Sequence, residues 1–453
     1  MHNKQNLFFP SLILIVQNVS IFFFDIFHAI MSIQFICLVL YGIYMPFCFD
    51  KVNINRKIVY WTAYVGIVAF NYLIGGDANF ILSFIVCNFS MLLMLRIHNL
   101  AKVEYSIIKL CTFVHLCASL AVYFLPQGII DTIFLPLLGN NFTSNYSWRV
   151  ISSNNPGLTT QPGVNAFYLA LFVFVCITEF FEGGKKKLLY IALLFVSMLM
   201  ILTTAKRSAL ILTVIVPILF YTKFLKGRTV QTMKKLSTTK IACGFVFIAL
   251  CFIYYVSTHP EFLMNLMEKE ETLSSARDIS NGRYNLWDIA YQGFLSSPLY
   301  GIGLKNIYNQ TGFDVHNTYI QILAETGIMG FSAFIFSLAC VYKQSLYNVK
   351  KYIRICTDSK DIKAISLGFM IFLFLIIYGF VGNTFIDYLP FMLFSISVFM
   401  INLKTRVRDN ILKSKEQKTI QPTKGGHKMV TYQNYVSLFY CQITSCPSDG
   451  GIS

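Results

Sequence analysis

Charged residues are scarce in this chain, and their scarcity excludes an ordinary soluble protein. Only 13% of the 453 residues are Asp, Glu, Lys or Arg, whereas soluble proteins contain about 25%. Hydrophobic residues make up 55%, and Phe alone contributes 43 residues. Because such a chain cannot cover itself with polar side chains, we expect most of its surface to face lipid.

Several chemical devices are also missing from the sequence. The twelve cysteines form no Cys-x-x-Cys pair and lie mostly in apolar runs, so we expect free thiols that pack as small hydrophobic groups. There is no Asp-x-Asp, no His-Glu-x-x-His and no glycine-rich P-loop. We therefore expect no bound metal, no cofactor and no nucleotide-linked donor.

Long apolar runs are what the chain has instead, and each has about the 20 residues that a membrane span needs. They predict an all-α integral membrane protein with about twelve transmembrane helices. The first run is too long for the core of a cleavable signal and lacks a cleavage site, so it is interpreted as a span. The expected spans are 7–24, 27–49, 58–75, 79–97, 105–126, 163–181, 188–204, 208–225, 241–258, 317–342, 362–380 and 384–403.

The positive charge is distributed unevenly between the two sides that these spans define. Of 37 Lys and Arg residues, 29 fall in connections on one side and seven on the other. Cytoplasmic loops retain Lys and Arg, so we expect both termini in the cytoplasm of an inner-membrane-type protein. The net charge of +16 then reflects topology, and no nucleic-acid partner is needed to explain it.

The expected topology divides the chain into two parts. Residues 1–403 form a polytopic membrane domain with two long outer loops, 127–162 and 259–316, the larger of which lies in the periplasm between spans 9 and 10. Residues 404–453 are basic and then polar, and we expect a disordered cytoplasmic tail.

The first candidate site is a tight turn between two spans, Thr203-Thr204-Ala205-Lys206-Arg207. It places two cations on the side that otherwise excludes them. They are either a snorkelling pair that anchors the turn or part of an anion site, since a guanidinium group matches phosphate oxygens with two hydrogen bonds.

The second candidate lies in the larger outer loop. Apolar residues recur at helical spacing from Arg283 to Phe294, which predicts a short helix near the membrane surface that ends before Pro298. Arg283 at its start either stacks on Trp287 or an adjacent tyrosine, pairs with Asp288, or faces the same anion as Arg207.

The third candidate is His316, where the larger loop enters the next span. A helix N-terminus disfavours an imidazolium ion, and a neutral ring can accept a proton as a general base. The alternative is a histidine that caps the helix or meets a backbone carbonyl. Asn317 follows it, and Glu325 lies early in the span, where it either orients a basic partner or is only a satisfied polar group.

These three places also carry a resemblance. The segments TTAKRSALIL, GRYNLWDIAYQGFLSSPLYGIGLKN and HNTYIQILAETGIMGF resemble, in order and spacing, motifs of the O-antigen ligase and O-antigen polymerase superfamily of bacterial envelope proteins. The specific part covers roughly residues 200–335. One departure is Lys206 directly before Arg207, where relatives often have a small or polar residue.

The resemblance implies a metal-independent membrane glycosyltransferase that uses a glycan on undecaprenyl pyrophosphate at the periplasmic face. It implies that Arg207 and Arg283 bind the pyrophosphate, with Lys206 as a neighbour, and that His316 activates the acceptor hydroxyl. Arg149, in the first outer loop, is a further candidate, because the family often has an arginine there; an ordinary Asn- and Ser-rich loop explains the segment equally well. Trp287 and Asn317 are expected to support the site.

Three functions remain open at this point. A polymerase that joins lipid-linked repeat units of O-antigen or capsular polysaccharide is preferred, and a ligase that transfers the finished glycan to lipid A-core or protein would use the same donor site. A flippase of lipid-linked sugars is less expected, since transporters tend to show repeated halves and none is visible here. The expected partners are the lipid-linked oligosaccharide and membrane lipid, and whether a chain-length regulator binds stays open.

Overall fold

The computed structural model describes residues 8–27, 64–70, 75–82, 100–125, 154–159, 161–182, 186–225, 283–355 and 358–401, with isolated positions between them. The chain divides into residues 1–407 and 408–453, and all described residues lie in the first unit.

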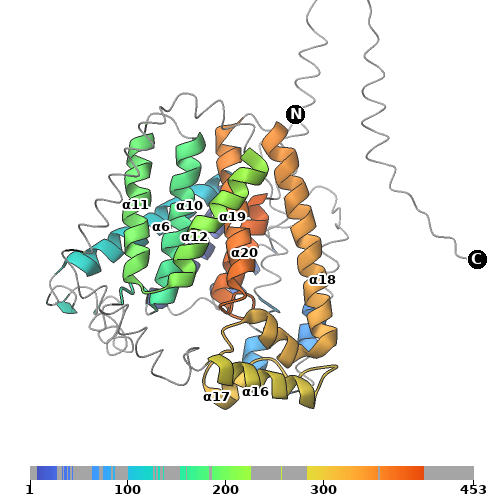
Figure 1. The fold of residues 1–453 in the computed structure, drawn as a ribbon. Coiled ribbons are helices and arrows are strands. Elements are labelled where there is room, and N and C mark those ends of the chain that lie inside the picture. Colours follow the sequence, from blue (N-terminus) through green and yellow to red (C-terminus); the bar gives the residue numbers. More distant parts are fainter. Residues whose placement is uncertain are drawn as a thin grey trace, which may run out of the picture. The chain divides into compact units, whose positions relative to one another are not determined.

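Every regular element of these described residues is a helix (Figure 1), which agrees with the all-α prediction. The elements are α1 (Phe8–Phe22), α2 (Phe24–Phe27), α6 (Ala101–Phe124), α10 (Pro162–Glu182), α11 (Lys187–Thr203), α12 (Arg207–Phe220), the π-helical η3 (Tyr221–Leu225), α16 (Arg283–Ser296), α17 (Asn306–Thr311), α18 (Thr318–Ile355), α19 (Ser359–Tyr378) and α20 (Tyr388–Ile401).

Five described helices are long and apolar enough to cross a membrane: α6, α10, α12 continued into η3, α18 and α19. Shorter apolar helices coincide with α1, α11 and α20. Together they fall on eight of the expected spans. The runs 27–49, 58–75 and 79–97 are described only in part, and 241–258 lies outside the described residues apart from Ser257. The total of twelve spans, the cytoplasmic termini and the tail 404–453 stay predictions.

Two helices form the centre of the described bundle. Side chains of α10 are buried all round its axis from Ala166 to Cys176, and α19 is buried in the same way from Ala364 to Phe372. A helix that is apolar on every face belongs inside a bundle. Around α10 pack α6, α11, α12 and α19.

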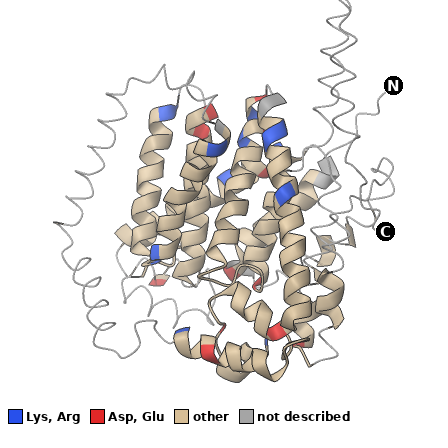
Figure 2. Cartoon of the chain, turned by 45° about the vertical axis from the view of Figure 1, so that its right-hand side comes forward, with Lys and Arg blue, Asp and Glu red and all other residues tan. Residues whose placement is uncertain are grey.

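One end of the bundle is fastened by ion pairs. Glu179 of α10 accepts hydrogen bonds from Lys109 of α6 at 2.6 Å and from Lys363 of α19 at 2.7 Å. Lys102 pairs with two carboxylates at the start of α19, Asp358 and Asp361. Lys109, whose charge falls within the expected span 105–126, is thus paired within the protein. Figure 2 shows Lys and Arg concentrated at this end of the helices.

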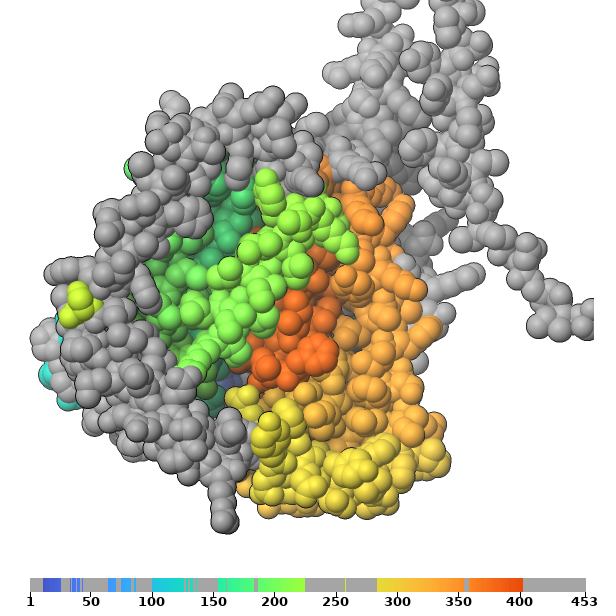
Figure 3. Space-filling model, in the orientation of Figure 1, coloured from blue at the N-terminus to red at the C-terminus, as the bar shows by residue number. Residues whose placement is uncertain are grey.

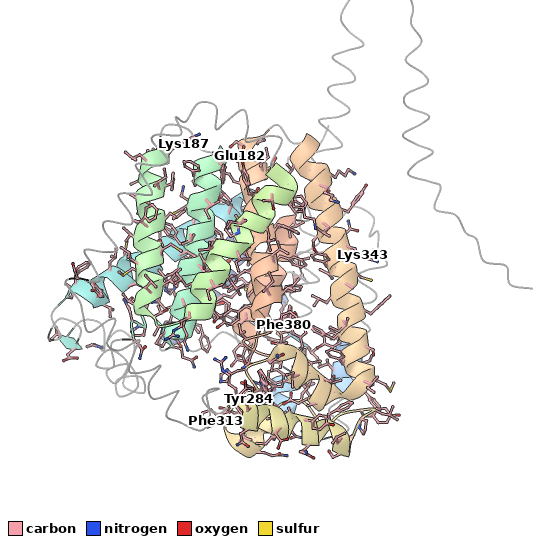
Figure 4. All side chains as sticks on the ribbon, in the orientation of Figure 1. Glu182, Lys187, Tyr284, Phe313, Lys343 and Phe380 are labelled. Atoms are coloured by element: carbon pink, nitrogen blue, oxygen red, sulfur yellow. The ribbon has the colours of Figure 1, made fainter. Side chains whose placement is uncertain are left out.

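The opposite end carries residues 283–317, which we call the outer segment because they belong to the larger of the two expected outer loops. Figure 4 places Glu182 and Lys187 at the ion-paired end and Tyr284 and Phe313 at the other. In Figure 3 the yellow surface of this segment lies below the surfaces of α12 and of the C-terminal helices. It has its own small core, in which α16 packs on α17 and on the start of α18 through Ala290, Ile307, Val315 and Ala324.

One boundary differs clearly from the expected one. The predicted helix over 283–294 is confirmed as α16, but α18 continues to Ile355, so that most of the expected loop 343–363 is helical. The reason is an amphipathic extension: Val349, Tyr352 and Ile353 recur at helical spacing and are buried. Hydropathy alone ends the span at 342 because Lys343, Lys350 and Lys351 interrupt the apolar run.

Candidate functional site

The charge state of one side chain, His316, is affected by three separate parts of the chain. They are the turn before α12, the start of α16 and the segment before α18. Loss of water lowers the pKa of His316 below its ordinary value, and the positive charges of Arg283 and Lys206 lower it further, while Asp314 opposes them. Lys206, Arg207, Arg283 and His316 are all exposed. The structure therefore brings Lys206, Arg283 and His316, which are far apart in the sequence, into one electrostatic environment.

The turn that carries Lys206 and Arg207 is built by the two threonines before it. Thr203 and Thr204 are buried, and their hydroxyls donate to the carbonyls of Met200 and Ile201, which closes the last turn of α11. Ala205 then takes a left-handed conformation with φ 56°. This reversal lets α12 begin at Arg207 and leaves Lys206 at its N-cap position.

Tyr378, the last residue of α19, interacts with both the turn and the start of α16, and no pattern in the sequence indicates it. Its hydroxyl hydrogen-bonds Ser208, and it lies within the field of Arg283. The ring is held edge-on against Phe167 of α10, with 4.5 Å between ring centroids. A tyrosine at the end of an apolar run has no distinguishing pattern, so no motif could have found it.

His316 is held just ahead of α18 by its neighbour. The side-chain oxygen of Asn317 accepts from the backbone N–H groups of Tyr319 and Ile320 at 3.1 and 3.2 Å, which is an N-cap. Asn317 is buried and His316 is exposed with φ 56°. Asn317 thus caps the helix, and the expected alternative role of His316 as that cap is not needed.

The start of α18 is also fastened to the end of α19. The backbone N–H of Thr318 donates to the carbonyls of Gly379 and Gly382, and its hydroxyl donates to Gly382 as well. The hydroxyl of Tyr319 donates to the carbonyl of Ile376 at 2.7 Å. Tyr378 belongs to the same stretch. The C-terminal end of α19 therefore contacts both the segment that presents His316 and, through Tyr378, Ser208 of α12.

Trp287 supports the histidine segment from the other side. Its indole N–H donates to the carbonyl of Val315 at 3.1 Å, one residue before His316. Trp287 lies one helical turn after Arg283, on the same face of α16. The helix that presents Arg283 is therefore hydrogen-bonded to the segment that presents His316.

A polar network lies beneath this segment, and Lys305 is its centre. The ammonium group of Lys305 contacts both carboxylate oxygens of Asp314 at 2.9 Å and Asp387 at 3.2 Å. Burial alone would lower the pKa of Lys305, but the charges of Asp387 and Asp314 raise it. Lys305, one of the seven Lys and Arg residues on the expected outer side, is thus an ion-paired structural residue.

Glu325 belongs to the same network and is fully buried. Gln321 donates to Glu325 at 3.1 Å and to Asp314 at 2.9 Å, while its amide oxygen accepts from the backbone N–H of Val315. The backbone N–H of Lys305 also bonds Glu325. These contacts place Glu325 in the network beneath the loop before His316, although its second carboxylate oxygen accepts no hydrogen bond within the described part of the chain. Which of its two expected roles applies stays a prediction.

Arg149 lies outside the described residues, so its proximity to the other cations stays a prediction. The described end of its loop does reach the site, because the backbone N–H of Asn155 donates to the carbonyl of Thr203 at 3.0 Å. Within the described part of the chain, no three His, Cys, Asp or Glu side chains gather as metal ligands would.

Residues 191–335 match the family model described as O-antigen ligase. The match confirms the resemblance to the O-antigen polymerase and ligase superfamily, and it covers the segment with Lys206, Arg207, Arg283, His316 and Glu325. Tyr378 and the residues of α6 and α10 lie outside it. No curated protein matches the chain. The family supports a polysaccharide-related membrane enzyme.

Proposed function

We propose that this chain is a metal-independent membrane glycosyltransferase that joins undecaprenyl-pyrophosphate-linked repeat units at the outer face of the bacterial inner membrane. In this reading it is a polymerase of O-antigen or capsular polysaccharide. The observation that carries the proposal is the convergence of Lys206 and Arg283 on His316, from three separate parts of the chain.

The cations suit the leaving group of such a reaction. Arginine binds phosphate oxygens through two parallel hydrogen bonds, and it stays charged under all cellular conditions. Arg283 and Arg207 are the residues we assign to the pyrophosphate, with Lys206 beside them and Arg149 as a further candidate. Arg207, Arg283 and Lys206 are exposed, so a lipid-linked substrate can reach them.

His316 suits the acceptor side. Its lowered pKa keeps the ring neutral near pH 7, so it can accept a proton. The acceptor hydroxyl gives its proton to the imidazole, its oxygen bonds to the anomeric carbon of the donor sugar, and the bond from that carbon to the pyrophosphate oxygen breaks. The electron pair leaves on the pyrophosphate, where Arg207 and Arg283 stabilise the charge.

A ligase is the second candidate, and the description of the matched family favours it. It would move the finished glycan from the same carrier to lipid A-core or to a protein. Both reactions place the pyrophosphate and the attacking hydroxyl in the same way, so the site residues serve either one.

The first test removes the proposed chemistry. His316→Ala should abolish long-chain glycan because the base is lost, and Arg283→Ala should reduce it strongly because part of the leaving-group stabilisation is lost. In both variants single lipid-linked repeats should accumulate. Glycan length is read on gels from cells with normal amounts of the protein. Lys186→Ala, which removes an exposed cation at the opposite end, is the control. Long chains retained in both site variants would refute the assignment.

The second test separates the two candidates by the product of a deletion strain. Without a polymerase, the acceptor still receives one repeat unit, whereas without a ligase it receives none. Sizing the glycan on lipid A-core by mass spectrometry therefore decides between them.

A further inference from the structure

Three buried polar side chains, which we call the asparagine cluster, lie next to the turn of Lys206 and Arg207. Ser119 comes from α6, Asn165 from α10, and Asn155 from the loop before α10, and they are at most 6% exposed. Asn165 Nδ2 donates to Ser119 Oγ at 3.0 Å and to the carbonyl of Asn155 at 3.2 Å. Asn155 Nδ2 donates to the carbonyl of Ser119 at 2.8 Å. The cluster therefore joins two helices and a loop.

The cluster is connected directly to the turn. The backbone N–H of Asn155 donates to the carbonyl of Thr203 at 3.0 Å. That carbonyl lies in the last turn of α11, where the helix itself offers no partner. Lys206 also lies beside α10, since a methyl group on Gly163 would come within 3.4 Å of Lys206 Cε.

Buried polar atoms at membrane depth are costly when they have no partner, so each member of the cluster fixes the position of the others. Asn155 in turn fixes where the carbonyl of Thr203 lies, three residues before Lys206 and four before Arg207. A displacement of about 1 Å at a reacting group can cost about a hundredfold in rate.

We infer that the asparagine cluster is a positioning device for the cations of the α11–α12 turn, with Asn155 and Asn165 as positioning residues. The inferred effect on substrate binding rests on the proposed function, because the cations bind the lipid pyrophosphate only if that function is correct. It adds two residues outside the matched family segment to the machinery of the site.

The competing explanation is that these side chains only hold α6 and α10 together, as polar residues between membrane helices do. A second buried contact between the same helices provides a matched control. Thr178 of α10 is 3% exposed, and its hydroxyl lies 2.9 Å from that of Tyr105 on α6, at the ion-paired end. Thr178→Val removes a hydrogen bond from the same helix pair, far along the helix from the turn.

The experiment compares Asn165→Leu with Thr178→Val in the full-length protein in detergent. Hydrogen–deuterium exchange of residues 203–209 should rise clearly in Asn165→Leu and stay at the parental level in Thr178→Val. The affinity for undecaprenyl pyrophosphate should fall about tenfold in Asn165→Leu alone, as expected for the loss of one buried hydrogen-bonded position. Asn155→Ala, in the loop, is the second variant if Asn165→Leu fails to fold.

Parental exchange and affinity in both asparagine variants would overturn the inference. Equal loosening of residues 203–209 in Thr178→Val would overturn it too, because general helix packing would then account for the effect. If the parent binds no undecaprenyl pyrophosphate, the proposed function fails, while the exchange measurement still decides whether the cluster positions the turn.

Discussion

The charge state of His316 depends on two cations and one carboxylate from different segments. Loss of water on burial lowers its pKa most, Arg283 and Lys206 lower it further, and Asp314 raises it. If the neutral ring is the base, activity is present above this pKa and is lost as the pH falls through it. That acid limb should lie below the ordinary histidine value of about 6.5.

Arg283→Gln should therefore move the acid limb of kcat/KM to higher pH, because one positive charge no longer opposes protonation of His316. Arg283→Gln also lowers the rate, but the shift is read from the position of the acid limb and not from its height. The pH profile of kcat/KM, which reports groups of the free enzyme, is measured on purified protein from about pH 5 to pH 8. Asp314→Asn should shift the limb in the opposite direction. An acid limb that stays in place in Arg283→Gln would mean that another group is titrating.

Tyr378 offers a test that changes a single oxygen atom. Tyr378→Phe removes the hydrogen bond to Ser208 but keeps the ring that packs on Phe167. We expect a loss of about tenfold in kcat/KM, since a hydrogen bond in such a place is worth about 1 kcal/mol or somewhat more. Tyr105→Phe, which removes the hydroxyl bonded to Thr178 at the other end, should retain parental kcat/KM; equal losses in both would make the effect one of stability.

The residues that sequence reasoning found and missed differ in a physical way. Lys206 and Arg283 were predictable because a cation on the expected outer side opposes the topological preference for positive charge inside. Tyr378 and Asn165 are neutral residues near the ends of apolar runs, where Tyr and Asn are ordinary. Their importance arises only from packing, because the partners, Ser208 and Asn155, come from other elements.

At the scale of elements, the outer segment depends on the close approach of two turns. The backbone N–H groups of Ile302 and Gly303 donate to the carbonyls of Ala324 and Glu325, and that of Ile328 donates to Pro298. Gly327 has φ 64° and ψ −171° and interrupts the helical geometry of α18. This combination is essentially restricted to glycine.

Gly327→Ala should therefore destabilise the outer segment by about 3 kcal/mol, from backbone strain together with steric overlap. A methyl group there would lie 2.4 Å from the carbonyl of Leu299, so the backbone must move. Gly312→Ala is the matched control: its φ is also positive, at 75°, but nothing lies within 4 Å of the added carbon, and it should cost only about 1–2 kcal/mol.

Thermal unfolding in detergent, followed by tryptophan fluorescence, measures both changes, since Trp287 lies in this segment. Similar losses in the two variants would show that the close approach at Gly327 does not matter.

The helices themselves were largely predictable, while their interruptions were not. Length and hydropathy place α6, α10 and α19 because each is a run of about 20 apolar residues. The same criterion treats 317–342 as one continuous span, because Gly327 leaves its hydropathy unchanged. It also misses the final turns of α18, where Val349 and Tyr352 bury one face and lysines occupy another.

At the scale of the whole molecule, the functional proposal depends on which face of the membrane carries the site. The described helices have ion-paired lysines at one end and His316 with its cations at the other. The excess of Lys and Arg in the expected inner connections assigns the first end to the cytoplasm. A donor carried in the outer leaflet can be reached only if that assignment is correct.

Single cysteines should report this directly. Gly312→Cys, in open space beside the site, should react with a membrane-impermeant maleimide in intact spheroplasts. Lys350→Cys, exposed near the end of α18, should react only after permeabilisation, and the parent protein gives the background of the native cysteines. Labelling of Lys350→Cys without permeabilisation would place the site on the cytoplasmic face. Lys206 and Arg283 would then face the compartment that contains nucleotide-linked sugars, and the proposed outer-leaflet donor would have to be abandoned.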